Sequence, residues 1–313
     1  MVEVLKIEEF NLEEKLSESY DYCYRMMKEN SKSFTFASNY LDKLQQRSVA
    51  ALYAYCRYTD DIADDINLDK EIKIKKLLEL ENQVLNIKDL EFNENPILHA
   101  LKDTVDRYDM PLSHLIELIN GCRMDLEITE YETIDQLDLY CYRVASIVGV
   151  LMCYIAGSTS DIALERAADL GKAMQITNIL RDISTDFEMG RVYIPMELRE
   201  KHNVNLEDIR KNHVTPEFIN LIKEETKRAK HYYKLGEEGL VYLPDGFNFS
   251  IEVASKVYAE ILNEIKRMNY LILGDRAIVS KRRKVWLTFK LKVKRIYFKS
   301  PFGYLHGIGV DTL

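Results

Sequence analysis

Residues 53–65 read Tyr-Ala-Tyr-Cys-Arg-Tyr-Thr-Asp-Asp-Ile-Ala-Asp-Asp and place four acids directly after an apolar run. On a helix, positions four apart share a face, so Asp60 and Asp64 form one carboxylate pair and Asp61 and Asp65 a second. Like charges at this spacing weaken a helix unless cations share them. Carboxylates so arranged favour Mg²⁺, which is completed by water and substrate phosphate, and Mn²⁺ would accept the same ligands. A solvated acidic helix end is the alternative for this stretch alone.

A second stretch, more than a hundred residues further on, repeats this spacing. Residues 175–186 read Gln-Ile-Thr-Asn-Ile-Leu-Arg-Asp-Ile-Ser-Thr-Asp. Asn178, Asp182 and Asp186 recur every four residues on one helix face, and Gln175 lies one turn earlier. If the two helices oppose each other, their acidic faces flank one cavity. Mg²⁺ ions held there could bind a diphosphate and assist its departure.

Two arginines lie within a turn of these carboxylates. Arg57 and Arg181 either bind phosphate oxygens or neutralise the acidic helices. Other chemical motifs are missing, since no histidine follows a glutamate by three residues, as di-iron bundles require. The zinc-protease, P-loop and dinucleotide-binding patterns are also absent, so the sequence indicates no NAD(P) or ATP site of those kinds.

Composition points to one helical domain. The 313 residues include 12 glycines and 6 prolines, about half the usual share. Apolar residues recur at helical spacing, and no strand alternation, linker or repeat is evident. We therefore expect an all-α domain that spans 1–313. The expected helices cover residues 12–29, 43–66, 70–87, 95–108, 113–129, 134–157, 162–188, 216–236, 250–273 and 280–298.

Charge separates the C-terminal segment from the rest. The formal net charge is −8, yet residues 276–310 contain ten Lys or Arg and no acid, which leaves 1–275 at −17. Four apolar residues of the basic segment share one helical stripe: Trp286, Phe289, Val293 and Ile296. The segment, from about 276, is therefore either a helix on an anionic membrane surface or a terminal helix packed on the acidic body. We expect no nucleic-acid partner, because no module signature is present.

The cysteines and the N-terminus favour a cytoplasmic protein, and peripheral membrane contact through the basic segment stays one of its two alternatives. Five cysteines, an odd number without C-x-x-C spacing, indicate a reducing compartment. The first residues carry acids where a signal peptide would carry lysines. The longest apolar stretch, 147–156, is about half the length of a membrane crossing.

Seven motifs follow one another over about residues 20–290 and together resemble a known family. They are 31–34 (Ser-Lys-Ser-Phe), 53–61, 124–127 (Met-Asp-Leu-Glu), 140–149 (Tyr-Cys-Tyr-Arg-Val-Ala-Ser-Ile-Val-Gly), 175–186, 190–195 (Gly-Arg-Val-Tyr-Ile-Pro) and 258–262 (Tyr-Ala-Glu-Ile-Leu). The resemblance is to the squalene/phytoene synthase family, the head-to-head prenyl synthases. At the position of the second acidic motif, chain-elongating synthases have a further D-D-x-x-D, whereas this chain has N-x-x-x-D-x-x-x-D. Terpene cyclases would show N-D-x-x-[ST]-x-x-x-E there, and this pattern is absent from the chain.

The resemblance implies an isoprenoid-synthase-type helical bundle around a central cavity, with residues 31–34 in a flap over it. The metal ligands that it implies are Asp60, Asp64, Asn178, Asp182 and Asp186. The catalytic residues are Asp60, Asp64, Asp182, Asp186, Arg57 and Tyr53. With Arg181 added from its spacing, the expected substrate-binding residues are Ser31, Lys32, Ser33, Phe34, Arg57, Tyr140, Gln175, Asn178, Arg181, Tyr258 and Arg276.

The implied reaction joins two prenyl diphosphates. One substrate loses diphosphate, the double bond of the other attacks the allylic cation, and proton loss gives a cyclopropylcarbinyl diphosphate; a second ionisation then joins the C1 carbons. Residues 140–146 most resemble phytoene synthases, which make phytoene from two geranylgeranyl diphosphates without NADPH, as the first step of carotenoid biosynthesis. Dehydrosqualene and squalene synthases, which use two farnesyl diphosphates, are the alternative, and the former tend to differ at Arg143 and Ser146. A non-catalytic helical scaffold is the alternative from another class.

Overall fold

The computed structural model describes residues 2–89 and 95–299, with the side chains of 13–89 and 95–296. Residues 300–310 of the basic segment therefore lie outside the described part. Within it, the regular structure is helical, and the one bridge between extended residues joins Glu130 to Val192. The predicted all-α fold is confirmed.

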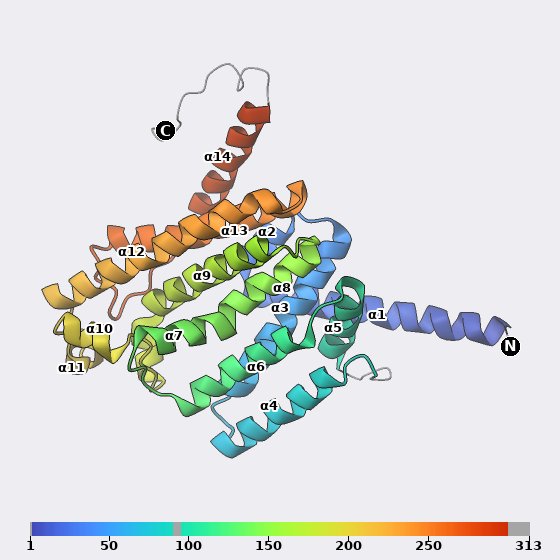
Figure 1. The fold of residues 1–313 in the computed structure, drawn as a ribbon, viewed down its shortest axis with the longest axis horizontal. Helices are drawn as coiled ribbons and strands as arrows, with labels where there is room; N and C mark the ends of the chain where they lie inside the picture. The colour runs from blue at the N-terminus through green and yellow to red at the C-terminus, as the bar shows by residue number, and fades with distance from the viewer. Residues whose placement is uncertain (1, 90–94, 300–313) are drawn as a thin grey trace.

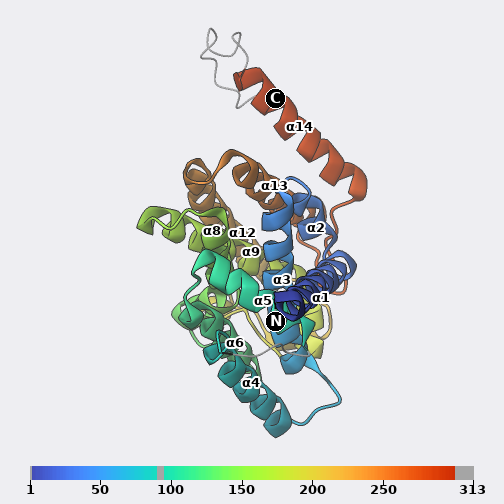
Figure 2. The same ribbon diagram turned by 90° about the vertical axis from the view of Figure 1, so that its right-hand side faces the viewer.

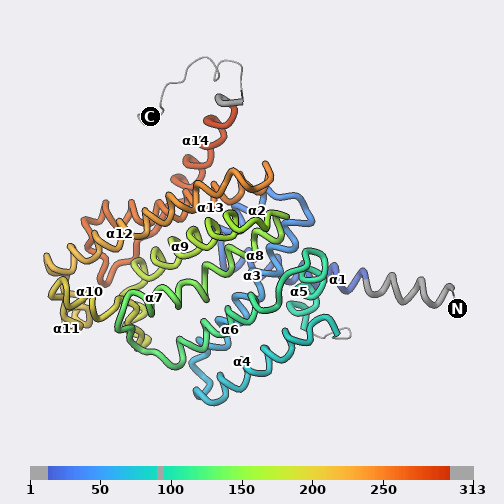
Figure 3. Tube along the Cα trace, in the orientation of Figure 1, coloured from blue at the N-terminus to red at the C-terminus, as the bar shows by residue number. Residues whose placement is uncertain are grey.

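Short connections join the helices into a continuous path, which Figure 3 traces as a tube. In chain order (Figure 1) the elements are α1 (Val2–Asn30), α2 (Lys32–Ser38), α3 (Lys43–Asp64), α4 (Lys70–Leu85), α5 (Pro96–Tyr108), α6 (Leu112–Glu127), α7 (Ile134–Cys141), the π-helical turn η1 (Tyr142–Ser146), α8 (Ile147–Ala156), α9 (Asp161–Glu188), α10 (Met196–Lys201), α11 (Leu206–Arg210), α12 (Pro216–Glu238), the 3₁₀ turn η2 (Gly239–Tyr242), α13 (Asp245–Arg267) and α14 (Lys281–Lys299).

The long helix α9 runs through the middle of the bundle. It packs against α8 on one side and against α12 and α13 on the other. One buried apolar cluster joins α1, α3, α5, α6 and α8, and a second joins α7, α9, α12 and α13. The acidic ends of α3 and α9 come from different clusters, so the predicted site lies where the two cores meet.

Glycines allow the segment before α9 to lie very close to it. A Cβ on Gly149 would lie 2.4 Å from the Ala167 carbonyl oxygen, and one on Gly171 would lie 2.4 Å from that of Ala145. The continuous segment α7–η1–α8 (Ile134–Ala156) is long and apolar enough to cross a membrane, but half of its most apolar window is buried inside the bundle. Its contacts with α6 and α9 are those of a core helix.

Several predicted helix ends are wrong, and α1 begins at Val2, ten residues before its predicted start. Helix α3 ends at Asp64, and Asp65 adopts an extended conformation in which its carboxylate accepts the backbone N–H of Asn67 at 2.9 Å. Asp61 and Asp65 therefore do not form the second helical pair expected from their spacing. Helix α13 begins directly after Pro244, five residues before its predicted start. The proline ring fixes φ near the helical value, which favours the start of a helix at this point.

The short helices α2, α10 and α11 were not expected, because none is long enough to show an apolar period. Two successive residues with positive φ, Asn269 and Tyr270, follow α13 and end it before 273.

Candidate active site

The α3 side of the site carries Asp60 and Asp64 on its last two turns. Asp60 accepts a hydrogen bond from the Cys122 thiol, with Sγ 3.3 Å from Oδ1. Its side chain is accessible to solvent, yet desolvation by surrounding protein, together with the charges of Asp64 and Asp125, raises the pKa of Asp60 to about 7.

The α9 side carries Asp182 and Asp186 one turn apart. Asp182 sits between two guanidinium groups: Nη2 of Arg181 is 2.5 Å from Oδ2, and Nε of Arg276 is 2.7 Å from Oδ1. Asp186 makes no ion pair within the described residues. Burial and the nearby charge of Asp182 raise the pKa of Asp186 to about 7, although Arg191 opposes the shift.

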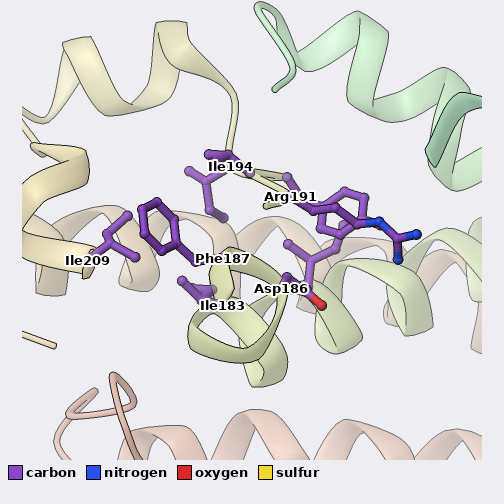
Figure 4. Close-up of a pocket in the computed structure, with 9 residues that line it drawn as sticks. Ile183, Asp186, Phe187, Arg191, Ile194 and Ile209 are labelled. Carbon is purple, nitrogen blue, oxygen red and sulfur yellow. The ribbon is translucent and has the colours of Figure 1, made fainter. Parts of the chain in front are cut away.

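The two sides meet at Arg191, which follows α9. Its Nη2 lies 2.8 Å from Oδ1 of Asp64, and its side chain is only 15% exposed. Burial opposes the charge of Arg191, but Tyr193, Asp125 and Asp64 hold its pKa above the ordinary value. In Figure 4 the Arg191 guanidinium and the Asp186 carboxylate turn to the same side, away from a small apolar pocket with room for about one water. Asp64 of α3 and Asp186 of α9 are thus both influenced by the charge of Arg191.

A third carboxylate, Asp125 on α6, lies between them. It accepts hydrogen bonds from the hydroxyls of Tyr193, at 2.7 Å, and Tyr140, at 3.0 Å. The two rings stack with centroids 5.0 Å apart. Burial raises the pKa of Asp125 to about 6, against the effects of Arg191 and the two hydroxyls. Tyr140 is itself buried, so it reaches the site through its hydroxyl.

Aromatic rings from three helices line the neighbouring region. The Phe34 ring on α2 lies 6.1 Å from that of Tyr53 on α3 and 6.0 Å from that of Tyr258 on α13. The Tyr258 hydroxyl donates to Oδ1 of Asn178 at 2.7 Å, and Nδ2 of Asn178 donates to Oε1 of Gln175 at 3.2 Å. Aromatic faces and the polar residues of α9 therefore belong to one continuous surface.

The remaining predicted residues lie at the start of α2. Ser31 caps α2 by accepting the backbone N–H of Phe34 at 3.3 Å, and Ser33 Oγ accepts a hydrogen bond from Lys284 at 2.8 Å. Lys32 is exposed.

Arg57 does not contact Asp60 or Asp64. It pairs instead with Asp61, Nη2 to Oδ1 at 2.6 Å, and both side chains are about half exposed. This pair is compatible with the neutralising role, and the diphosphate-binding role of Arg57 stays a prediction.

A family model places these elements among known proteins: the model for squalene/phytoene synthase matches residues 27–283. The chain belongs to the squalene/phytoene synthase family. Members of this family are prenyltransferases, and so is this protein. The comparison therefore removes the support for a non-catalytic scaffold, and the head-to-head prenyl synthase resemblance is confirmed.

Relatives that are named for different products have similar sequence identities to this chain. A 4,4'-diapophytoene synthase of Staphylococcus haemolyticus is 34% identical over 286 residues, covering 89% of this chain and 99% of the relative. A phytoene synthase of Arthrospira platensis is 30% identical, covering 86% and 91%. The tomato (Solanum lycopersicum) chloroplastic phytoene synthase 1 is 33% identical, and the match spans 86% of this chain but 66% of the relative.

A solved structure shares the fold along almost the whole chain. A dehydrosqualene synthase crystallised with a ligand superposes with a TM-score of 0.83 at 30% identity, covering 90% of this chain and 98% of that one. The isoprenoid synthase fold of this squalene/phytoene synthase family member is therefore established independently of its sequence motifs.

The carboxylates of this family member suit a hard divalent cation, although they do not converge. Within residues 2–89 and 95–299, no three acidic, histidine or cysteine side chains already meet at one point. Asp64 and Asp182 are paired with arginines, whereas Asp60 and Asp186 make no ion pair in the described part of the chain. Oxygen ligands spread over two helices fit Mg²⁺, whose remaining positions are filled by water and substrate phosphate.

Four residues of this site received no role from the sequence: Cys122, Asp125, Arg191 and Tyr193. Asp125, Arg191 and Tyr193 lie within motifs 124–127 and 190–195, which identified the family without indicating contacts. The available signal for Asp125 was an acid on the apolar face of α6, where burial needs a partner.

Proposed function

We propose that this squalene/phytoene synthase family member joins two allylic prenyl diphosphates head to head, with Mg²⁺ or Mn²⁺ between its acidic helices. The supporting observation is Arg191, whose guanidinium lies 2.8 Å from Asp64 of α3 and whose charge also acts on Asp186 of α9. Such an arrangement of opposed carboxylates and arginines matches the charge of a metal diphosphate.

Each part of the site has a task in this reaction. Bound Mg²⁺ would neutralise the diphosphate and make it a better leaving group. Arg181 and Arg276, which lie beside Asp182, donate hydrogen bonds to diphosphate oxygens. The faces of Phe34, Tyr53 and Tyr258 stabilise the allylic cation and keep water from it.

Substrate length is proposed as C20, with phytoene as the product and no need for NADPH. The support is the likeness of residues 140–146 to phytoene synthases. Two residues of this motif have packing roles, since Ser146 Oγ donates to the Ala168 carbonyl at 2.7 Å and Arg143 pairs with Glu117 at 3.0 Å. These roles weaken the motif as a guide to chain length, and the diapophytoene synthase relative favours the C30 reaction as the second candidate.

Product analysis tests both levels of the proposal. Purified protein is incubated with farnesyl or geranylgeranyl diphosphate and Mg²⁺ or Mn²⁺, with and without NADPH. We expect phytoene and released diphosphate from the C20 substrate, independent of NADPH. A C30 product from farnesyl diphosphate alone would change the substrate length, and diphosphate release from neither substrate would overturn the proposed reaction.

We further propose a cytoplasmic location, as the first enzyme of a carotenoid pathway. All five cysteines are free thiols, which suits a reducing compartment. Fractionation of cells that produce the protein tests the location, with salt-released peripheral material counted separately. Recovery from an oxidising compartment, or resistance to salt extraction, would contradict it.

A further inference from the structure

One face of helix α14 fixes it to the body of the protein. Nε of Arg283 lies 2.8 Å from Oε1 of the buried Glu260 on α13. Near the other end, Nη2 of Arg295 lies 2.8 Å from Oε2 of Glu252. Leu291 is buried between these contacts. The sequence alternative of a basic helix packed on an acidic body therefore describes this inner face.

The outer face of α14 is apolar and uncovered by the described part of the chain. Its five apolar side chains are 47% to 71% exposed and form what we call the outer stripe: Val285, Trp286, Phe289, Val293 and Ile296. With 3.6 residues per turn they fall within an arc of about 100°. The Trp286 ring packs against the Arg283 guanidinium, 4.5 Å from the ring centroid, and still leaves 48% of the side chain exposed.

Cations border the outer stripe on both sides. Lys281 and Lys292 fall on one edge of the helical projection, Lys290 falls on the other, and Arg282 falls within the arc of the stripe. All four are exposed, and residues 281–296 contain eight Lys or Arg and no acid. Long cationic side chains beside an apolar stripe can keep their charges at lipid headgroups while their stems lie on the acyl boundary.

The size of the outer stripe disfavours a second copy as its partner. Its five side chains expose on the order of 600 Å² together, below the roughly 800 Å² that each partner of a stable complex buries. A single convex helix also offers no groove for a protein partner. The exposed aromatic residues, Trp286 and Phe289, suit a water–lipid interface.

Helix α14 also contacts α2, which carries residues of the flap expected at 31–34. Nζ of Lys284 on α14 donates to Ser33 Oγ on α2 at 2.8 Å, and the next residue of α2 is Phe34 of the aromatic wall. Figure 2 shows α14 extending from the side of the molecule where α2 and α13 lie. A surface held by α14 would therefore lie beside the aromatic wall.

We propose that the outer stripe of α14 docks the protein on an anionic bilayer, with α2 at the membrane surface. This goes beyond the proposed reaction and does not depend on it. If the proposed reaction also holds, amphiphilic prenyl diphosphates would enter, and a hydrocarbon product would leave, without crossing bulk water.

Trp286 is the only tryptophan of the chain and reports directly on this contact. The full-length protein is titrated with vesicles of phosphatidylglycerol and phosphatidylcholine, and separately with phosphatidylcholine alone. We expect a blue shift of the emission on anionic vesicles, quenching by lipids brominated on their acyl chains, and at least tenfold weaker binding in 1 M salt.

Two double variants distinguish vesicle binding through the outer stripe from nonspecific adsorption through any exposed apolar residues. Phe289→Glu with Ile296→Glu keeps Trp286 and should weaken vesicle binding at least tenfold. Leu78→Glu with Leu85→Glu changes two residues on α4 that are also about half exposed, and should leave binding unchanged. Circular dichroism and diphosphate release without vesicles check that both variants are folded.

Three results would overturn the proposal. These are no emission shift on anionic vesicles, equal binding by the Phe289/Ile296 variant and the wild type, or a shift that depends on protein concentration without lipid. The last result, with a dimer in sedimentation, would assign the outer stripe to a second copy.

Discussion

The acidic ends of α3 and α9 share the same four-residue spacing but are neutralised differently. On α9, Asp182 is held by Arg181 and Arg276, with contacts of 2.5 and 2.7 Å. On α3, Asp60 has a thiol partner and no ion pair within the described residues, and its pKa rises to about 7. The first carboxylate of the α9 pair therefore has cationic partners and that of the α3 pair has none, whereas the second carboxylates show the reverse, because Asp64 pairs with Arg191 and Asp186 makes no ion pair within the described residues.

This difference suggests a division of labour. Two guanidinium groups fixed at Asp182 offer donors to a diphosphate as soon as it arrives. The desolvated, unpaired carboxylate of Asp60 gains most from a divalent cation, because a cation removes the cost of its charge. The predictions below test whether the two sides act differently.

The largest effect is expected from Asp60→Asn. The amide keeps the size of the side chain but removes the charge that attracts a cation, so turnover should fall about 10³-fold or more, corresponding to roughly 4 kcal/mol of transition-state stabilisation. Product formation measures the loss, with circular dichroism as the control for folding. Normal turnover by a folded Asp60→Asn protein would show that this carboxylate is not needed.

A smaller loss is expected from Arg276→Gln on the α9 side. Removing one of two guanidinium groups at Asp182 should lower kcat/KM by about 10- to 100-fold, since a charged hydrogen bond contributes about 1.5–3 kcal/mol. Arg276→Lys keeps the charge but not the two-pronged geometry and should recover part of the loss. Equal activity in wild type and Arg276→Gln would remove Arg276 from the diphosphate site.

Stability should respond to the hydrogen bonds at Asp125. Tyr193→Phe removes the shorter donor to this buried carboxylate and should lower the free energy of unfolding by about 1.5–3 kcal/mol at pH 7.5. Tyr131→Phe is the matched control, because the buried Tyr131 hydroxyl has no hydrogen-bond partner in the structure. Urea denaturation compares them, and an equal loss in both variants would show that the Asp125 bond contributes nothing specific.

The smallest effect concerns pH. Because the folded-state pKa values of Asp60 and Asp186 are raised to about 7, from about 4 in the unfolded chain, metal-free protein should lose stability as pH rises from about 4 through 7. Mg²⁺ should therefore raise Tm by a few degrees more at pH 8 than at pH 6. Scanning calorimetry measures this, and the difference should vanish in Asp60→Asn with Asp186→Asn. A Mg²⁺ effect that does not change with pH would contradict the assignment.

The sequence was sufficient for what depends on periodicity. The i, i+4 acids and apolar spacing located α3, α9 and most other helices, and the motifs indicated the family. Periodicity could not show that Asp65 leaves the helix, since that depends on how the chain caps itself with Asn67. It also could not place Arg191 between the two acidic ends, because that contact depends on how the chain turns back after α9.

The basic C-terminal helix illustrates a similar limit. Its sequence left open whether it packs on the body or lies on a membrane, and one helix can do both with different faces. Arg283 and Arg295 bind the body, whereas Trp286 and Phe289 remain outside. Only packing against α13 shows which cations are already paired.

The most direct test of the central claim, that both acidic helices hold cations for one diphosphate, is Mn²⁺ binding followed by electron paramagnetic resonance. Titrations with inorganic diphosphate compare the wild type, Asp60→Asn, Asp182→Asn and the double variant. We predict that diphosphate promotes Mn²⁺ binding to the wild type and that each single variant loses most of it, so the double variant loses little more. Unchanged Mn²⁺ binding in either single variant would contradict the claim.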